Sequence, residues 1–507
     1  MRIAFRVDSS AAIGTGHLMR CLTLAQRLRE QGADVLFVMR DLPGAMLKRP
    51  ELAGFECAVL PPPSGGGCSD GLAHSAWLGT DQATDARETL AVLGNGVDWM
   101  VVDHYAIDRQ WHSVVRQRAA KIMVIDDIAD RSHDCDLLLD QNLQNAPDRY
   151  SELVGYQAQT LLGPRYALLR DRFAELRPRA LAKRREKLER LLIFLGGVDA
   201  AGATLLALEA IQAAGIDNLQ LDVVIGPANP DRDRIRHWCG SRPNVQLFEG
   251  GVELADLMLE ADLSIGAAGS ASWERCCMGL PTIVVTVAEN QREGATALAR
   301  AGAVIWAGDK DSIATANLAA ILDLFRFCPD HVFPLADAAA KLVDGEGCRR
   351  VVQEMIKPQI AIRRAGHTDC DMVWSWRNDE VTRRWSTNPQ KIPLEDHRAW
   401  FAGALREERR VMVIGEDATG PVGFVRFDLA EMEATVSIFL SPERHGRGLG
   451  SALLTEALHW LKSTAPQVSE IKAHVVAGNQ QSARMFEATG FARCGEDFSL
   501  AINGDRK

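Results

Sequence analysis

Apolar runs long enough for buried strands alternate with helix-like stretches over residues 1–160. Four such runs lie at 3–7, 35–38, 99–102 and 122–125. After the first run, apolar side chains recur at helical spacing, at Leu18, Cys21, Leu22, Ala25 and Leu28. This βαβ rhythm predicts a parallel sheet that helices cover on both faces.

A second series of the same kind begins after a strongly charged stretch, 177–190, which we interpret as a solvated connecting helix. Further strand-like runs lie at 191–195, 221–225, 262–265 and 281–287. A helix-like stretch over 335–356 closes the series. The pattern predicts an α/β chain with two successive doubly wound, Rossmann-type halves, 1–170 and 188–356, and a cleft between them. Many α/β proteins share this architecture, so it does not identify the function.

The pattern changes again near residue 360. Alternating apolar and polar positions at 411–415, 423–429 and 435–440 predict strands, and a glycine-rich turn then opens a long apolar helix. We therefore expect a third, α+β domain over 360–505. This agrees with the roughly three domains that a chain of 507 residues suggests.

Composition and charge narrow the function classes. Apolar residues make up 47% of the chain and charged residues 24%, which are ordinary globular values. The net charge of -10 disfavours a bulk nucleic-acid binder, and no apolar run reaches the roughly 18 residues of a membrane span. The first residues show no secretory signal segment. The 11 cysteines include no CxxC-like pair, so we expect reduced thiols in a cytoplasmic enzyme.

The first candidate site is the loop from Asp8 to His17, between the first strand and the first helix. Gly14 and Gly16 let the backbone approach a ligand closely, and the helix start offers free N–H groups to a phosphate. His17 lies at the positive end of this helix, which favours the neutral imidazole that a general base requires. The spacing is not G-x-G-x-x-G, which disfavours dinucleotide binding. A purely structural histidine is the alternative.

A second loop of small residues, 266–274, follows a strand and opens a helix in the second half. Its glycines and serines, Ser270 among them, permit close contact with phosphates. Glu274 lies one helical turn further on, where it is placed to accept hydrogen bonds from a ribose diol; a solvated helix carboxylate is the alternative. Asn290 follows the next strand at the edge where ligands bind in such sheets.

These motifs together resemble the UDP-sugar hydrolase of pseudaminic acid biosynthesis. Residues 2–30 look like the opening of that enzyme, and further matching blocks lie at 101–105, 125–127, 135–140, 163–170, 196–199 and around Glu274 and Asn290. The family acts on UDP-2,4-diacetamido-2,4,6-trideoxy-β-L-altropyranose and is similar to GT-B glycosyltransferases, but transfers the sugar to water. The match covers about residues 1–350.

The resemblance implies that His17 activates the water, with Tyr105 nearby, and that Glu274 and Asn290 hold the UDP part. No metal is implied. We expect the substrate to be contacted by Asp8, Gly14, Gly16, Ser270, Glu274 and Asn290. For Asp103 and Asp126, which end two strands, a site role and a structural cap remain equally open. Attack of the water on the face of C1 opposite UDP would invert that carbon.

The third candidate site is a glycine-rich loop, 444–451, between a strand and the long C-terminal helix. Its successive amides form an anion nest suited to a pyrophosphate. Asn479, Ser482 and the Gly-Phe pair at 490–491 follow at the distance seen in GNAT acetyltransferases, which 360–505 resembles. The resemblance implies acetyl-CoA as cosubstrate, contacted by His445, Gly446, Arg447, Gly448, Gly450, Ser451, Asn479 and Ser482.

Two residues depart from the GNAT pattern. His445 replaces the usual glutamine or arginine, and Phe486 stands where a tyrosine general acid is frequent. A phenylalanine cannot protonate the departing thiolate. Another group or a water must do so, or release is unassisted, or the domain has lost its activity. Glu433 and His474 are weak candidates for the base.

The acceptor side of the GNAT domain carries Trp374, Trp376, Trp385 and Trp400, for which core packing is the alternative. Arg377 and Asn378 complete a Trp-Arg-Asn signature similar to the pseudaminic-pathway N-acetyltransferase, although GNATs that modify protein N-termini or antibiotics share it. In that pathway, acetylation of the 4-amino group of UDP-4-amino-4,6-dideoxy-N-acetyl-β-L-altrosamine immediately precedes UDP removal.

The fusion therefore predicts a bifunctional enzyme that acts on UDP-linked amino sugars. Tethering of the two catalysts would raise the local concentration of the intermediate. The alternative is a GT-B glycosyltransferase with a regulatory or differently specific GNAT domain. We expect no nucleic-acid or membrane partner.

Overall fold

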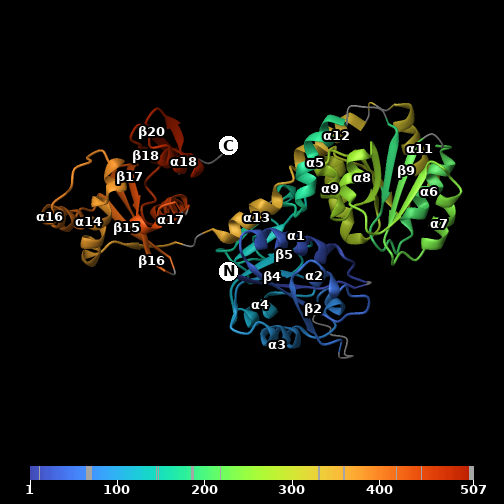
Figure 1. Ribbon diagram of the computed structural model, residues 1–507, viewed down its shortest axis with the longest axis horizontal. Coiled ribbons are helices and arrows are strands. Elements are labelled where there is room, and N and C mark those ends of the chain that lie inside the picture. The colour runs from blue at the N-terminus through green and yellow to red at the C-terminus, as the bar shows by residue number, and fades with distance from the viewer. Residues whose placement is uncertain are drawn as a thin grey trace. The chain divides into compact units, whose positions relative to one another are not determined.

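A computed structural model describes residues 1–501 except 11, 64–70, 144–145, 147, 184–187, 217–218, 329, 331, 358–359, 418 and 447. The chain forms two compact units, Met1–Met355 and Ile356–Lys507 (Figure 1). We refer to them as unit 1 and unit 2. None of the helices in the described part of the chain has the length and apolar character of a membrane span.

Unit 1 begins with a parallel sheet in the order β3-β2-β1-β4-β5-β6-β7. Its strands are β1 (Arg2–Val7), β2 (Asp34–Arg40), β3 (Glu56–Leu60), β4 (Val97–Asp103), β5 (Ala119–Ile125), β6 (Leu137–Asp140) and β7 (Gln159–Leu162). Its helices are α1 (Gly16–Glu30), α2 (Lys48–Leu52), α3 (Gln82–Val92) and α4 (Arg109–Val115). Apolar side chains are buried on both faces of the sheet, as expected for all-parallel strands.

The second sheet of unit 1 is also parallel, in the order β10-β9-β8-β11-β12-β13. Its strands are β8 (Arg190–Phe194), β9 (Gln220–Ile225), β10 (Val245–Glu249), β11 (Leu263–Ala267), β12 (Thr282–Thr286) and β13 (Ile305–Asp309). Its helices are α5 (Asp171–Lys183), α6 (Ala203–Ala213), α7 (Arg232–Gly240), α8 (Leu254–Glu260), α9 (Ala271–Cys277), α10 (Arg292–Arg300), α11 (Thr315–Phe327) and α12 (Val332–Leu342). Both predicted βα series are thus present as parallel sheets.

The helix predicted over 335–356 is two helices in the structure. The first is α12, and the second is α13 (Gly347–Ile356). Gly345, at φ +86°, separates them in a backbone conformation that ends a helix. α12 packs against the core of the second sheet. α13 returns to the first sheet, where Cys348, Val351 and Met355 join the core beneath α1 (Figure 1).

Unit 2 holds a sheet in the order β14-β15-β16-β17-β18-β20-β19. Its strands are β14 (Ala361–Arg364), β15 (Arg410–Asp417), β16 (Gly420–Ala430), β17 (Glu433–Leu440), β18 (Glu470–His474), β19 (Ala492–Cys494) and β20 (Asp497–Ala501). Its helices are α14 (Cys370–Asn378), α15 (Glu380–Arg384), α16 (Leu394–Ala404), α17 (Leu449–Thr464) and α18 (Gln480–Ala488).

The strands β17 and β18 run in parallel and pair only over 433–435 and 470–472. β17 continues to Leu440 without pairing to β18, so the two strands part within the sheet. The helices α17 and α18 pack on one face of this sheet, and α14 and α16 pack on the other.

Candidate functional site

His17 and Asp103 meet at the carboxyl ends of two neighbouring strands. β1 pairs with β4 so that Val7 lies beside Asp103, and α1 starts from the loop after β1. The imidazole Nδ1 of His17 lies 2.6 Å from Oδ1 of the buried Asp103. An ionised carboxylate only accepts hydrogen bonds, so Nδ1 carries the proton and Nε2 keeps its lone pair. His17 is therefore held in the tautomer that can accept a proton.

Arg20 keeps the Asp103 carboxylate ionised. It follows His17 by one helical turn, and its Nε and Nη2 donate to the two carboxylate oxygens at 2.6 and 2.7 Å. Burial alone would raise the pKa of Asp103, but the charge of Arg20, with His17, holds this pKa well below its usual range. The sequence left the role of Asp103 open, and the structure places its side chain against His17. Arg20 was missed, although its spacing from His17 was a signal.

Tyr105 packs its ring against His17. The two ring centroids are 4.7 Å apart, and the ring planes are nearly perpendicular at 85°. The Tyr105 hydroxyl donates to Asp127 at 2.8 Å, and Arg20 Nη1 donates to the same carboxylate oxygen at 2.6 Å. Burial, reinforced by the charge of Asp127, raises the pKa of Tyr105 well above its usual range. Tyr105 therefore stays protonated and fixes the plane of the imidazole.

An aromatic wall that the sequence did not predict continues from Tyr105. Trp77 stacks on Tyr105 with ring centroids 5.7 Å apart, and His74 lies 4.4 Å from Trp77. Burial lowers the pKa of His74. Trp77 lies in a short 3₁₀ helix, Ser75–Leu78, and His74 directly precedes it. This segment is too short for a periodic pattern, which is why its proximity to His17 left no sequence signal. Such a wall is suited to the apolar face of a sugar ring.

Asp8 lies in a buried ion cluster beneath the loop. Its carboxylate pairs with Arg6 Nη1 at 2.7 Å, accepts the backbone N–H of Arg40 at 2.7 Å and lies 3.3 Å from His104 Nε2. Asp8 is fully buried. This carboxylate therefore supports the loop from beneath, and its expected contact with substrate stays a prediction.

The loop after β11 faces the loop after β1. A side chain added at Gly16 would lie 3.6 Å from Ser270 Oγ, and one at Gly197 would lie 3.8 Å from Thr15 Oγ1. Gly14, whose N–H donates to the Ser10 carbonyl at 2.9 Å, closes the turn just before Gly16. The two glycine-containing loops predicted from the sequence are thus brought together.

Glu274 and Asn290 follow β11 and β12 at the carboxyl edge of the second sheet. The Glu274 side chain is one-fifth exposed (20%), and Arg170 Nη2 lies 4.0 Å from its carboxylate. Burial raises the pKa of Glu274 to about 7. Asn290 is exposed in the turn Glu289–Gln291. Their expected roles toward UDP stay predictions.

A cavity of about 1170 Å³ opens in unit 2 where β17 and β18 part. The described residues of the predicted cofactor site all line it: His445, Gly446, Gly448, Gly450, Ser451, Asn479 and Ser482. Arg447 lies outside the described residues. Asn479 caps α18 by accepting the N–H of Ser482 at 3.1 Å. A gap between parallel strands, bordered by a glycine-rich turn, fits an extended thioester cosubstrate.

Other side chains of the same cavity come from α14 to α16 and from β16. Trp385 and Trp400 line it and are more than one-third exposed (38% and 37%). Trp376 is buried in the core, and Trp374 donates to the Ile392 carbonyl at 2.8 Å. Core packing thus explains Trp376, and a hydrogen bond fixes the half-buried Trp374, whereas Trp385 and Trp400 are not core residues. Arg377 and Arg426 also line the cavity.

Of the two weak candidates for the base, only His474 borders the cavity. Its Nδ1 lies 2.9 Å from Asp497, which would orient the ring. Glu433 instead pairs with Lys472 at 2.7 Å. Phe486 lines the cavity from a cluster with Phe491 and Phe498, at centroid distances of 5.0 and 5.6 Å. This packing explains an apolar ring at that position.

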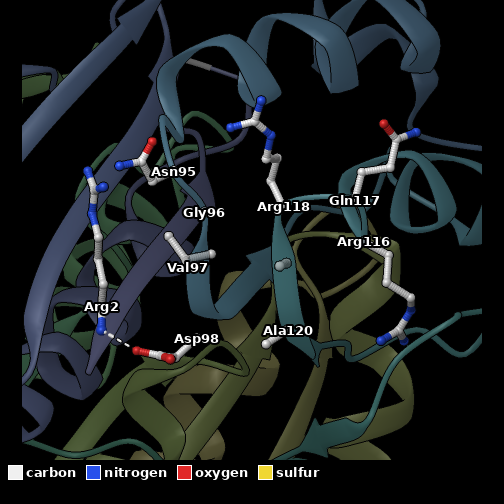
Figure 2. Close-up of a pocket in the computed structure, with 10 residues that line it drawn as sticks. Arg2, Asn95, Gly96, Val97, Asp98, Arg116, Gln117, Arg118 and Ala120 are labelled. Carbon is white, nitrogen blue, oxygen red and sulfur yellow. Dashed lines mark hydrogen bonds between the residues drawn. The ribbon is translucent and has the colours of Figure 1, made fainter.

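A further hollow, of about 400 Å³, lies at the opposite end of the first sheet. Figure 2 shows its lining, in which the backbone nitrogen of Arg2 donates to Asp98 at 2.6 Å. Arg2, Val97 and Ala119 are the first residues of β1, β4 and β5. The hollow therefore lies at the amino ends of the strands, away from His17.

Two family models match parts of this chain. Residues 191–342 match the glycosyltransferase family 28 C-terminal domain, and residues 359–492 match the acetyltransferase (GNAT) domain. The chain is therefore a fusion of a GT-B-like pair of Rossmann-type halves with a GNAT domain. The predicted fold class and the predicted fusion are confirmed.

The relatives and solved structures extend this result. The UDP-2,4-diacetamido-2,4,6-trideoxy-beta-L-altropyranose hydrolase of Campylobacter jejuni is 25% identical over 303 residues, which cover 60% of this chain and 97% of that protein. An uncharacterized protein of Methanocaldococcus jannaschii is 21% identical over 517 residues, which cover 97% of each chain. MurG of Acinetobacter baumannii is similar in fold, with a TM-score of 0.50 at 15% identity, over 70% of this chain and 99% of its own.

Proposed function

We propose that this chain is a bifunctional enzyme of pseudaminic acid biosynthesis. Unit 2 acetylates the 4-amino group of UDP-4-amino-4,6-dideoxy-N-acetyl-β-L-altrosamine, and unit 1 then removes UDP from the product by hydrolysis. The observation that carries the proposal is the 2.6 Å contact of His17 Nδ1 with Asp103, which leaves Nε2 free as a base. Homology to the Campylobacter jejuni hydrolase along almost its whole length supports the choice of substrate.

In unit 1, His17 Nε2 takes a proton from a water molecule. The water oxygen bonds to C1 of the sugar, and the bond from C1 to the UDP oxygen breaks. UDP leaves with the bonding electron pair, and the amides of the 266–270 loop meet its charge. Asp103 stabilises the imidazolium that forms, since Arg20 keeps its carboxylate ionised. Attack from the face opposite UDP gives inversion at C1.

In unit 2, acetyl-CoA would supply the acetyl group as an activated thioester. The lining residues from His445 to Ser451 would hold its pyrophosphate, and Asn479 and Ser482 border the same cavity. His474, oriented by Asp497, is the side chain we assign to remove a proton from the sugar ammonium. Phe486 has no proton to give, so the thiolate takes its proton from water or from another group, or leaves unprotonated.

The direct test supplies the purified chain with UDP-4-amino-altrosamine and acetyl-CoA and follows the products by mass spectrometry. We expect acetylated free sugar, UDP and CoA. Untouched 4-amino compound, with cleavage of the pre-acetylated UDP-sugar, would remove the acetyltransferase assignment. If neither compound reacts, the sugar series is wrong. Release of UDP only when a second sugar or lipid is added would identify a glycosyltransferase instead.

The raised pKa of Glu274 makes nucleotide binding pH-dependent. Ribose hydroxyls donate to the ionised carboxylate, and with a pKa of about 7 this form predominates above pH 7 and is lost below it. We expect the affinity for UDP-N-acetylglucosamine to fall about tenfold from pH 8 to pH 6. Its diphosphate is a diester that does not titrate in this range. Calorimetry on Glu274→Gln should show weak binding of UDP-N-acetylglucosamine that no longer varies with pH. If the affinity of the wild type is independent of pH, Glu274 does not bind the ribose in the proposed way.

Arg377 supports a negatively charged substrate as the molecule that unit 2 acetylates. Its Nη1 is buried without a hydrogen-bond partner among the described residues, and burial, with the charges of Arg383 and Arg426, lowers its pKa. Asp396 is the one carboxylate among the described residues that line the cavity. A diphosphate on the amino sugar would supply the missing partner.

We therefore expect Arg377→Met to raise the KM for the UDP-amino sugar about tenfold or more, while the KM for acetyl-CoA changes little. Steady-state kinetics on both substrates measure this. Arg384→Met is the matched control, because Arg384 is exposed and is not among the lining residues. An equal rise in both KM values would show that Arg377 acts on the fold of the domain.

A further inference from the structure

Arg275 differs from the other buried arginines of unit 1. Its side chain is 2% exposed, and its Nη2 donates to the Ala267 carbonyl at 2.6 Å and to the Ser272 hydroxyl at 3.1 Å. Its Nε and Nη1 have no hydrogen-bond partner within the described part of the chain. No ion pair joins Arg275 to a described carboxylate. Three other buried arginines of unit 1 each pair with two carboxylates: Arg6 with Asp8 and Asp85, Arg20 with Asp103 and Asp127, and Arg40 with Asp85 and Glu88.

The charge of Arg275 persists despite this environment. Burial lowers the pKa of its guanidinium to about 10, which is still well above neutral pH. A buried charge without a counter-ion is unfavourable, and the other arginines show how this chain usually provides one. Among the described residues of the second half of unit 1, Arg275 is therefore a buried cation without an ion-pair partner, and the carboxylate of Glu274 acts on it only at longer range.

The guanidinium lies directly behind the 266–270 loop, whose first two residues are the last residues of β11. A Cβ added at Gly266 would collide with Arg275 Nη1, so glycine at this position leaves the space that the guanidinium occupies. The hydrogen bond to Ala267 fixes the loop from behind. At the other end of the same loop, Ser270 faces Gly16 in the loop that carries His17.

We propose that Arg275 is a positioning residue whose buried charge is balanced by the diphosphate of a nucleotide sugar on the 266–270 loop. The inference rests on the proposed binding of UDP-sugars by unit 1. In a site of low dielectric, a fixed cation acts over several ångströms, so it favours an anion on the far side of the loop without touching it. The bound nucleotide supplies a second counter-charge, in addition to the longer-range effect of the Glu274 carboxylate.

The test measures UDP and uridine affinity by calorimetry, and thermal unfolding, on the full chain with Arg275→Met and Arg275→Lys. For Arg275→Met we expect UDP to bind about tenfold or more weakly, with uridine affinity nearly unchanged because uridine has no phosphate. The Tm without ligand should be no lower than that of the wild type, since an unpaired buried charge is removed. Arg275→Lys keeps the charge and should keep most of the UDP affinity.

Arg190→Met is the matched control in the same half. Arg190 begins β8 at the opposite end of the strands and pairs with the buried Asp222 at 2.6 Å. Its loss should lower the Tm and leave UDP affinity unchanged. Three results would overturn this inference without affecting the proposed function. They are a wild-type UDP affinity in Arg275→Met, an equal loss of UDP affinity in Arg275→Met and Arg275→Lys, and a large fall in the Tm of Arg275→Met. A wild-type chain that does not bind UDP would overturn the proposed function as well.

Discussion

His17→Asn should convert the chain into an enzyme that stops at the acetylated UDP-sugar. Asparagine can still donate a hydrogen bond to Asp103, so the cluster around Arg20 remains, but it cannot accept a proton from water. General bases contribute about 10²- to 10⁴-fold to a rate, and we expect a loss of UDP release in this range. Acetyl transfer should continue at the wild-type rate, because unit 2 carries its own cavity.

Mass spectrometry of a timed reaction distinguishes the two products. The acetylated UDP-sugar should accumulate in the variant and remain transient in the wild type. Calorimetry with UDP provides the control, because nucleotide affinity should be unchanged. Retention of more than about a tenth of the UDP release would rule out His17 as the base.

Asp103→Asn should impair stability and activity together. The amide leaves Arg20 without one of its two carboxylate partners, and its N–H groups favour the imidazole tautomer with the proton on Nε2. In that tautomer Nε2 carries a proton, so it cannot accept one from the water molecule. We expect UDP release to fall at least about 10²-fold. Breaking a buried ion pair of this kind typically lowers the free energy of unfolding by about 3–5 kcal/mol.

The pH dependence of stability gives a second readout for this variant. Because the pKa of Asp103 is held below its usual value in the folded protein, its stabilisation is full at neutral pH and is lost as the pH falls below about 4. Denaturant unfolding at pH 7 and in acid should therefore show a difference between wild type and variant that narrows in acid. Asp222→Asn, which removes a buried partner of Arg190, should lose stability and keep activity.

The loops that we propose as sites were predictable from local sequence. Gly14, Gly16 and His17 lie within four consecutive residues, and the strand-loop-helix pattern places them at the carboxyl ends of the parallel strands without any knowledge of distant contacts. The GNAT loop from His445 to Ser451 was recognisable for the same reason. In both cases the backbone itself forms much of the site, so composition and spacing carry the information.

The partners of these loops depend on tertiary contacts and were not predictable. Asp103 reaches Arg20 because β4 lies beside β1 in the sheet. Asp127 reaches Arg20 from the end of β5, the next strand beyond β4. Trp77 comes from a 3₁₀ helix of four residues, and nothing in the neighbouring sequence indicates that it stacks on Tyr105. The burial of Asp8 and its pairing with Arg6 were not predictable either, because the sequence presented it only as an acid at the start of a glycine-containing loop. Pattern analysis does not separate a solvated charge from a buried pair.

The return of α13 to the first sheet has a consequence for biosynthesis. The apolar face beneath α1 is made early, but the residues that complete its core, Cys348, Val351 and Met355, are made only after the whole second sheet. Even the indole N–H of Trp99 finds its acceptor in the carbonyl of Met355, at 3.1 Å. During synthesis, the half of unit 1 that holds the second sheet can therefore complete its core first. The half that holds the first sheet leaves the ribosome earlier but completes its core only when α13 has been made.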